Sequence, residues 1–389
     1  MIKKITIDNI SSISHLELDF EKGNYKFLEH NVENDVLKTI GIYGHNGSGK
    51  TSFFIAIAQF INFMSLPVDN LNPFVVNQLK YDEFMKIQNS GKQPKIADFD
   101  KIIGTISFDF EIDGDTYFYQ LSVAAFNQIL KERLIKNSVT IFDRDEHLKV
   151  YYKGKTIENN VGLVPFLRSA ASNYLDDADI QKVYSYLSSF VFVDLTNINS
   201  KEGFVTSKLF QTTKTLDLVC QKSEDVKSLL VEYKDFPVFT VEKEEAITNN
   251  GQSEQYYVSI EDNGERIRLP FAFISTGMKN QTVLLSLILS MNKGSVLFID
   301  ELEMGMHPST IKNFIEVAQN KGIQLVFSSH NTNTLQDMRP DQIYFASWKK
   351  GYSTFKRLSK IYPNIREVNN IEKMYMSSVF DEVIDGENN

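Results

Sequence analysis

The spacing of hydrophobic residues in the N-terminal part of the chain predicts strands and one helix. Apolar residues alternate with acidic ones over 16–20, which is the pattern of a half-buried strand. The apolar stretch 39–43 runs into a glycine-rich turn, and we expect a helix after it. Residues 106–112 and 117–123 alternate on either side of Asp113-Gly-Asp115 and predict a hairpin.

The middle of the chain, residues 126–264, has a mixed pattern. It offers a short strand pair around 143–147, an amphipathic helix over 180–187, polar linkers near 195–212 and 243–255, and a hairpin turn at Asn263-Gly264. We interpret this segment as an α+β insert.

The pattern changes again from residue 270 onward, to apolar helix, continuous apolar strand, helix and strand. Buried parallel strands with helical crossovers give this order. We therefore predict an α/β fold, a mixed sheet with a parallel core and flanking helices. Its sequence is split into 1–125 and 265–389 around the insert 126–264. No internal repeat or sustained heptad run is visible, so a long coiled-coil arm is not expected.

Composition narrows the class of protein. A length of 389 residues favours two or three structural units. With 42% hydrophobic and 23% charged residues, wholesale disorder and collagen-like structure are excluded. The net charge of −9 gives no support to an indiscriminate nucleic-acid coat, although it is compatible with a local basic groove.

Compartment and membrane contact follow from three observations. Residues 1–8 enter a strand pattern directly, without an apolar signal core. The most apolar run, 53–66, is interrupted by polar residues and is shorter than a membrane helix. Cys220 is the single cysteine and has no partner for an internal disulfide. We expect a cytoplasmic protein without a membrane span.

One motif has the pattern of a phosphate-binding loop: Gly44-His45-Asn46-Gly47-Ser48-Gly49-Lys50-Thr51-Ser52. It lies after a predicted strand and before a predicted helix, which is where this loop must lie. Glycines let backbone N–H groups converge on phosphate, and the helix N-terminus adds the positive end of its dipole. Lys50 is expected to reach the β- and γ-phosphates, and Thr51 to offer its hydroxyl to Mg²⁺. The alternative is a glycine-rich turn before an ordinary helix.

Two acids end the apolar strand 295–300. Asp300 and Glu301 are thereby placed at the C-terminal edge of a parallel sheet, where α/β folds bind ligands. Asp300 would bind in the Mg²⁺ shell, and Glu301 would be the general base that deprotonates the attacking water. Alone, a strand followed by Asp-Glu also fits a helix entry with acids near its dipole.

Two further segments can approach the same sheet edge. The apolar strand 322–329 ends at His330, which could form a hydrogen bond with a γ-phosphate or could be structural. A Ser/Gly loop with Ser275 and Gly277 precedes an apolar helix. This loop could serve a nucleotide held by another copy of the chain, or Ser275 or Thr276 could simply cap the helix.

Together these motifs resemble the ABC-type ATPase family in its soluble SMC/RecF-like branch, where phosphate loop, signature loop, Asp-Glu and His occur in this order. The resemblance implies that two heads sandwich two ATP molecules, each held between the phosphate loop of one chain and Ser275 and Gly277 of the other. The usual signature is Leu-Ser-Gly-Gly-Gln, whereas this chain has Ile274-Ser-Thr-Gly-Met278.

More narrowly, several runs resemble RloA/AbiLi-type ATPases of bacterial phage-defence and abortive-infection operons. These are the acidic run from Asp300 to Pro308, Ser328 to Asn331, Asp341 to Tyr344, and Asn370-Ile-Glu-Lys-x-Tyr375. The resemblance implies a separate effector protein, nuclease-like, because related enzymes carry a nuclease domain after the ATPase. About 59 residues follow His330 here, too few for such a domain.

Other features favour structural interpretations. Asp143-x-Asp145 could be a metal pair but fits a hairpin tip better. His307 could be catalytic, but a role in capping or at an interface fits better. The 29 Phe and 17 Tyr residues lie mostly at core spacing, so burial explains them better than base stacking.

The sequence thus predicts an ATPase that uses ATP and Mg²⁺, dimerises on ATP and gates or senses through a partner in an anti-phage system. DNA binding remains possible, and the competing function is a RecF-like ATP-dependent DNA clamp in repair. An ATPase subunit of a transporter is a third alternative. For the glutamine that senses γ-phosphate in this family, Gln120 is a candidate.

Overall fold

The computed structural model describes most of the chain. The described residues are 1–67, 71, 74–90, 102–124, 127–145, 147, 149–158, 162–173, 176–195, 205–206, 215–233, 238–248, 251–262 and 265–380.

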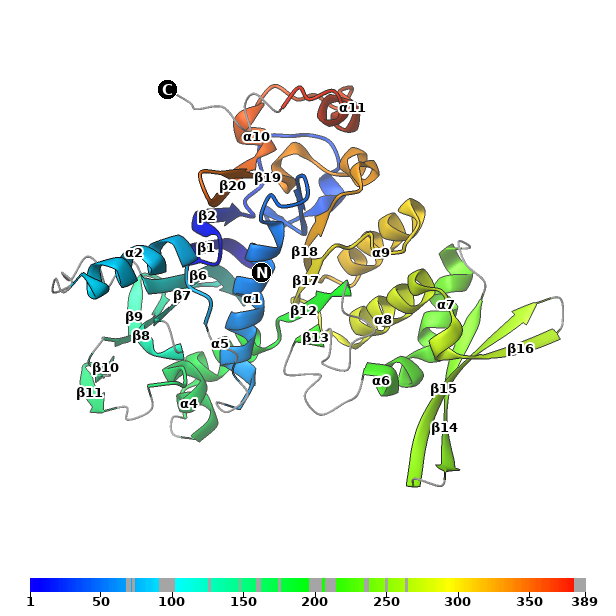
Figure 1. Ribbon diagram of the computed structural model, residues 1–389, viewed down its shortest axis with the longest axis horizontal. Helices are drawn as coiled ribbons and strands as arrows, with labels where there is room; N and C mark the ends of the chain where they lie inside the picture. The colour runs from blue at the N-terminus through cyan, green and yellow to red at the C-terminus, as the bar shows by residue number, and fades with distance from the viewer. Residues whose placement is uncertain are drawn as a thin grey trace.

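One large mixed sheet runs through the molecule (Figure 1). Its strands are β1 (Ile2–Ile10), β2 (Ile13–Asp19), β5 (Thr39–Tyr43), β6 (Ile103–Ile112), β7 (Asp115–Ala124), β8 (Ile129–Lys136), β9 (Val139–Arg144), β10 (Lys149–Tyr152), β11 (Lys155–Glu158), β12 (Val191–Asp194), β13 (Val205–Thr206), β17 (Val296–Asp300), β18 (Gln324–Ser329), β19 (Ile343–Lys349) and β20 (Tyr352–Arg357). Within the described residues their order across the sheet is β11-β10-β9-β8-β7-β6-β1-β2-β20-β19-β5-β18-β17-β12-β13.

The centre of this sheet is parallel. β12 pairs with β17, β17 with β18, β18 with β5 and β5 with β19, all in the same direction. All five residues of β5 and of β17 are buried, as expected for strands covered on both faces. The carboxyl ends of β5, β12, β17 and β18 therefore meet at one edge, which confirms the predicted parallel core.

Helices cover both faces of the parallel centre and separate two hydrophobic cores. On one face lie α1 (Lys50–Ser65), α4 (Phe166–Asn173) and α5 (Ala178–Ser188); on the other lie α6 (Thr215–Gln221), α7 (Ser223–Tyr233), α8 (Thr276–Ser290) and α9 (Pro308–Asn320). β17 divides its side chains between the cores: Phe298 packs on the α1 side, and Leu297 and Ile299 pack on the α8 side. The predicted α/β architecture with flanking helices is confirmed.

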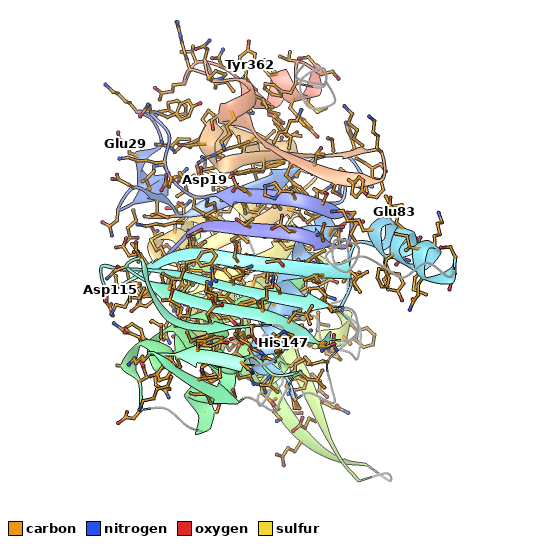
Figure 2. All side chains as sticks on the ribbon, turned by 90° about the vertical axis from the view of Figure 1, so that its left-hand side faces the viewer. Asp19, Glu29, Glu83, Asp115, His147 and Tyr362 are labelled. Atoms are coloured by element: carbon orange, nitrogen blue, oxygen red, sulfur yellow. The ribbon has the colours of Figure 1, made fainter. Side chains whose placement is uncertain are left out.

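The other half of the sheet is antiparallel. β1, β6, β7, β8 and β9 lie side by side, each antiparallel to the next, and Figure 2 looks onto this layer with Asp115 labelled at one end of it. The predicted hairpin forms between β6 and β7, and both Asp113 and Gly114 adopt positive φ in its turn. The aromatic residues Phe60, Phe108 and Phe190 pack against one another under this layer, which confirms that burial explains them.

The segment 126–264 is not separate from this sheet. β8 to β11 extend its antiparallel half, and β12 joins the parallel centre beside β17. The division into 1–125, 126–264 and 265–389 stays a prediction, but the sheet crosses both of its boundaries. Hydrophobic alternation shows that these strands exist, whereas it does not specify which strands they pair with.

The polar stretch 243–255 was expected to be a linker, and this prediction is wrong. It belongs to β14 (Phe239–Thr248) and β15 (Gly251–Asp262), which pair along their whole length, and β16 (Glu265–Pro270) pairs with β15. This small sheet projects from the body of the molecule (Figure 1). Its polar sequence has a physical reason, because charged side chains pair across the strands, for example Lys243 with Glu254. The turn at Asn263-Gly264 lies outside the described residues.

The remaining described elements are two short strands, three helices and four 3-10 turns. They are β3 (Val32–Glu33), β4 (Val36–Leu37), α2 (Gln78–Asn89), α10 (Leu358–Ile361), α11 (Ile371–Met376) and the 3-10 turns at Glu29–Asn31, Phe271–Phe273, Thr332–Asp337 and Pro340–Gln342. Across the part of the chain that is described, every helix is too short or too polar to span a membrane.

A buried charge pair joins β8 to β9. Glu132 and Arg144 lie opposite each other in register and both have fully buried side chains, with 3.8 Å between Oε2 and Nη1. Glu132 also accepts hydrogen bonds from the Tyr119 hydroxyl and from the backbone N–H groups of Phe166 and Leu167, which begin α4. Burial raises the pKa of Glu132, so its contacts must offset the cost of desolvation. This carboxylate ties α4 to the sheet.

We predict that Glu132→Ala lowers the free energy of unfolding by about 3–5 kcal/mol, because it leaves the Arg144 charge buried without its carboxylate. Urea unfolding followed by circular dichroism measures the change. The matched control is Arg133→Ala, which breaks the solvent-accessible pair with Asp143 on the same two strands and should cost only about 0–1 kcal/mol. Equal losses in the two variants would contradict the role given to the buried pair.

Candidate nucleotide-binding site

The glycine-rich loop lies where the sequence placed it, between β5 and the start of α1. Lys50 is the first residue of α1, and Gly49 before it adopts a left-handed conformation with φ 89°. A Cβ atom at Gly49 would lie 1.6 Å from the Ser353 hydroxyl oxygen. Only glycine fits this close approach of the loop to β20. The strand, loop and helix therefore form the predicted context of a phosphate-binding loop.

Lys50 is held inside the loop. Its side chain amine donates hydrogen bonds to the carbonyl oxygens of Gly44 at 2.8 Å and His45 at 3.2 Å, and the residue is 6% exposed. Burial lowers the pKa of Lys50, while the carboxylates of Asp300, Glu303 and Glu301 act in the opposite direction. A positive charge thus faces three acids across the site.

Asp300 is bound to both neighbouring segments. The Ser328 hydroxyl at the end of β18 donates to its Oδ1 at 2.5 Å, and the Thr51 hydroxyl on α1 forms a second hydrogen bond with it. Burial raises the pKa of Asp300, and these two hydrogen bonds oppose that shift. The two side chains assigned to the Mg²⁺ shell thus lie in contact with each other, and their role as ligands stays a prediction.

Glu301 has an uncommon backbone conformation, with φ 57°. Its N–H donates to the Ser328 hydroxyl oxygen at 2.8 Å, which holds the chain in this left-handed turn. Burial raises the pKa of Glu301, and the negative charges of Asp300 and Glu303 raise it further. The carboxylate therefore lies in an acidic environment that favours proton uptake.

His330 follows β18 and is fixed by a residue that sequence reasoning gave no role. Its backbone N–H donates to Glu303 Oε1 at 2.5 Å, and the other carboxylate oxygen of Glu303 is buried without a partner. Burial, and then the Lys50 charge, lower the pKa of His330, so its imidazole is neutral at pH 7. Glu303 was noticed only as part of the family-like acidic run.

Asp194 is a second residue that the sequence analysis missed. It ends β12 and lies in register beside Asp300 on the neighbouring parallel strand. Its charge raises the pKa of Asp300 and of Glu301. The sequence could have indicated this residue, because Val191-Phe-Val-Asp194 is an apolar strand that ends in an acid, as the strand before Asp300 is.

Gln120 lies elsewhere. It is in the middle of β7, in the antiparallel half of the sheet, where its amide donates to Ser122 at 3.4 Å. It does not line the cavity at the phosphate loop. The structure gives no support to Gln120 as a nucleotide sensor.

Eight of the predicted residues line one cavity of about 350 Å³. Its lining consists of Ser12, Asn46, Gly47, Gly49, Lys50, Thr51, Ser52, Glu301, His330 and Trp348. Residues from five separate stretches of the sequence thus meet here. Ser12 and Trp348 were not predicted; Ser12 comes from the β1–β2 turn, where its hydroxyl lies 2.6 Å from that of Ser52.

Ser275 and Gly277 do not line this cavity. Ser275 caps α8, its side chain accepting a hydrogen bond from the Met278 N–H. A Cβ atom at Gly277 would lie 2.1 Å from the carbonyl oxygen of Gly305, so α8 begins in close contact with the loop that follows the acids. Within one chain the structure does not bring these two residues to the phosphate loop.

The capping role expected for His307 is confirmed, whereas the expected hairpin tip holds for Asp145 and not for Asp143, which lies within β9. His307 caps α9 by accepting a hydrogen bond from the Ser309 N–H. Asp143 pairs with Arg133, and Asp145 accepts the N–H groups of His147 and Lys149 in the turn between β9 and β10.

This arrangement has the parts that phosphoryl transfer to water needs. Backbone N–H groups and Lys50 can hold phosphates, Thr51 and Asp300 can ligate a divalent cation, and Glu301 can accept a proton. These groups line or adjoin one cavity at the carboxyl edge of parallel strands. The class of protein that they define is an ATPase-type nucleotide hydrolase.

Comparison with known families agrees with this class. Residues 40–336 match the family described as "AAA domain, putative AbiEii toxin, Type IV TA system". The match covers most of the chain, and the protein therefore belongs to this family of AAA-domain ATPases. A search of curated proteins found no match.

Solved structures of SMC heads are also similar to this chain. The SMC head bound to the C-winged helix domain of ScpA has a TM-score of 0.48 at 12% identity, and the alignment covers 92% of this chain and 99% of that chain. The SMC head domain from Thermotoga maritima gives 0.42 at 13% identity, over 92% and 98% of the two chains. The Pyrococcus furiosus head with an extended coiled coil gives 0.45 at 12%, over 98% and 99%.

We predict that Glu303→Ala lowers the turnover number for ATP by about 10²-fold, because His330 loses the carboxylate that holds its backbone. ATP affinity should change little, since the phosphate loop is untouched. A coupled phosphate-release assay and isothermal titration calorimetry measure the two quantities. Glu316→Ala, on the exposed side of α9, is the control. Wild-type turnover in Glu303→Ala would contradict this role.

Proposed function

We propose that this protein hydrolyses ATP to ADP and phosphate with Mg²⁺ as cofactor. The observation that carries the proposal is the convergence of Lys50, Thr51, Glu301 and His330 on one cavity, with Asp300 hydrogen-bonded to Thr51. These residues come from β5–α1, β17 and β18, so the fold itself assembles the site. An ordinary glycine-rich turn would have no need for a lysine, two acids and a histidine around the same cavity.

The residues present fit both ATP and Mg²⁺. Gly47 leaves open space above the loop, since no atom lies within 4 Å of a Cβ built there. Thr51 and Asp300 supply one hydroxyl and one carboxylate, and Mg²⁺ commonly binds in this way, with substrate phosphates and water completing its shell.

Each residue has a separate task in the proposed reaction. Lys50 and the loop N–H groups bind the β- and γ-phosphates. Glu301 orients a water molecule and takes its proton as the water oxygen attacks the γ-phosphorus and the bond to the β-phosphate oxygen breaks. Neutral His330 can donate a hydrogen bond to the transferred phosphoryl group. Bound Mg²⁺ would supply positive charge to the phosphate oxygens.

The raised pKa of Glu301 supports its assignment as the base. A carboxylate with its ordinary pKa is a weak proton acceptor, and burial beside Asp300 and Glu303 makes it a stronger one. Glu301 also lies at a strained backbone position, and such positions occur preferentially at active sites. The backbone position distinguishes Glu301 from Asp300, since burial raises the pKa of both carboxyl groups and Asp300 Oδ1 already accepts the Ser328 hydroxyl.

We further propose that ATP closes a dimer through Ser275 and Gly277 and that the closed dimer controls a separate effector protein, nuclease-like, in a phage-defence or abortive-infection system of RloA/AbiLi type. Support comes from the family description, which names a putative toxin of a Type IV toxin–antitoxin system. The N-terminus of α8 is free of the site within its own chain, so Ser275 is available to a second copy. The protein is proposed to act in the cytoplasm.

Two substitutions separate binding from chemistry. Lys50→Ala should weaken ATP affinity by at least about tenfold, because it removes the buried cation. Glu301→Gln should leave ATP affinity near that of the wild type and lower turnover by about 10²–10⁴-fold, because only proton transfer is lost. Calorimetry measures affinity, and a phosphate-release assay measures turnover. Robust turnover by Glu301→Gln would refute the assignment of the base.

The dimer and the partner have their own test. Glu301→Gln with Mg-ATP should sediment as a dimer and wild type with ADP as a monomer, because unhydrolysed ATP keeps the heads together. A tagged pull-down of Glu301→Gln from the native host, with mass spectrometry and nuclease digestion of what is bound, should recover a nuclease-like protein. Recovery of DNA without a protein would instead favour the RecF-like clamp.

A further inference from the structure

The C-terminal helix α11 contacts two loops of the nucleotide site. Asn370 begins it as an N-cap, its side chain accepting a hydrogen bond from the Lys373 N–H at 2.8 Å. This cap orients Glu372 and Tyr375, which stand one turn apart on the helix. The two side chains reach different loops, and the proposed reaction assigns no role to either.

Glu372 binds the segment that follows His330. Its carboxylate accepts a hydrogen bond from the Thr332 hydroxyl at 3.2 Å and another from the Gln336 amide. Both partners belong to the 3-10 turn Thr332–Asp337, which starts two residues after His330. Glu303 accepts the backbone N–H of His330 itself. One carboxylate thus holds His330, and a second holds the turn that follows it.

Tyr375 contacts the phosphate loop. Its ring stacks with the imidazole of His45, with 6.4 Å between ring centroids and 27° between planes. It also stacks with Phe345 of β19 at 5.0 Å and 18°, and Phe345 is buried in the sheet. His45 supplies one of the two carbonyl oxygens that hold Lys50. The ring therefore connects the sheet to the part of the loop that positions the lysine.

A cavity lies beside this contact. It has a volume of about 240 Å³ and is lined by the loop residues 44–48, by residues 345–348 of β19 and by Tyr375. The hydroxyl of Ser48, a residue that is 5% exposed, is buried here without a hydrogen-bond partner. Packing against β19 does not fill the space under the loop, and the Tyr375 ring supports the loop at His45.

We infer that Glu372 and Tyr375 are positioning residues, through which α11 sets the geometry of the phosphate loop and of His330 together. Tyr375 acts on ATP binding through His45, and Glu372 acts on hydrolysis through the turn after His330. A displacement of α11 would move both loops, so this helix is a point at which hydrolysis can be controlled. The inference rests on the proposed ATPase function.

The first test compares Tyr375→Ala with Tyr375→Phe. The alanine variant should raise the dissociation constant and the KM for ATP by roughly three- to thirty-fold, with a smaller effect on kcat. The phenylalanine variant keeps the ring and should stay within about twofold of the wild type. Binding can be followed through the fluorescence of Trp348, the single tryptophan of the sequence, which lines both cavities and is 52% exposed.

The second test compares Glu372→Ala with Glu372→Gln and with Glu367→Ala, an exposed acid on the same segment. Glu372→Ala should lower kcat by roughly three- to thirty-fold and leave the dissociation constant unchanged. Glu372→Gln retains an acceptor oxygen and should recover part of the loss, and Glu367→Ala should match the wild type. Equal kinetic constants in wild type, Tyr375→Ala and Glu372→Ala would overturn the inference.

Amide hydrogen exchange of the protein without nucleotide tests the positioning role of α11 independently of ATP hydrolysis. Tyr375→Ala should speed exchange in residues 44–52, and Glu372→Ala in residues 330–337, while β6 and β7 exchange as in the wild type. Unchanged exchange in both loops would overturn the inference even if ATP is hydrolysed. If the wild type neither binds nor hydrolyses ATP but the two variants show these exchange changes, the proposed function is refuted and the positioning role stands. Accelerated exchange throughout the chain would mean that the residues serve general stability, which also overturns it.

Discussion

The nucleotide site depends on the parallel pairing of β18 with β5 on one side and β17 on the other. Ser329 is in register with Tyr43, and Ile299 with Phe327, so three strands end at the same level. Because the loop after each strand leaves at this level, the phosphate loop, the two acids and His330 emerge together. More than 200 residues of sequence separate the phosphate loop from the acids, and only this pairing makes them neighbours.

The strand pairing brings several charged groups together in a site where burial disfavours their charged forms. Lys50 and Asp300 are both buried, Glu301 lies close to both of them, and Asp194 lies close to the two acids. Burial lowers the pKa of the lysine and raises the pKa values of Asp300 and Glu301, which means that desolvation opposes each of these three charges. Hydrogen bonds from Ser328 and Thr51 offset part of this cost for Asp300. A bound phosphate chain would pair with Lys50, and its cation would pair with Asp300. The proposed role of α11 is to hold the two loops at the distance that this pairing requires.

Much of the fold and site could be predicted because the signals are local. Gly44 to Thr51 is a contiguous run whose chemistry follows from its own residues, and Asp300 and Glu301 follow a strand that periodicity reveals. The predictions that failed concern contacts between distant segments of the chain. Residues 243–255 are polar because the strands form a projecting sheet with paired charges, a property of strand partners that a single segment does not display. Asp194 acts through strand register, and Glu303 acts through one backbone hydrogen bond. Gln120 lies in the predicted hairpin, but local patterns do not show that this hairpin belongs to the antiparallel half of the sheet.

The central claim is that Lys50, Thr51 and Asp300 form one Mg-ATP site. The most direct measurement is an experimental structure of the Glu301→Gln variant with ATP and Mg²⁺. It should show phosphates in the loop 44–51, the ion bound by Thr51 and by Asp300 directly or through water, and the introduced amide side chain facing a water molecule near the γ-phosphorus. Nucleotide bound elsewhere, or a cation that contacts neither Thr51 nor Asp300, would contradict the account.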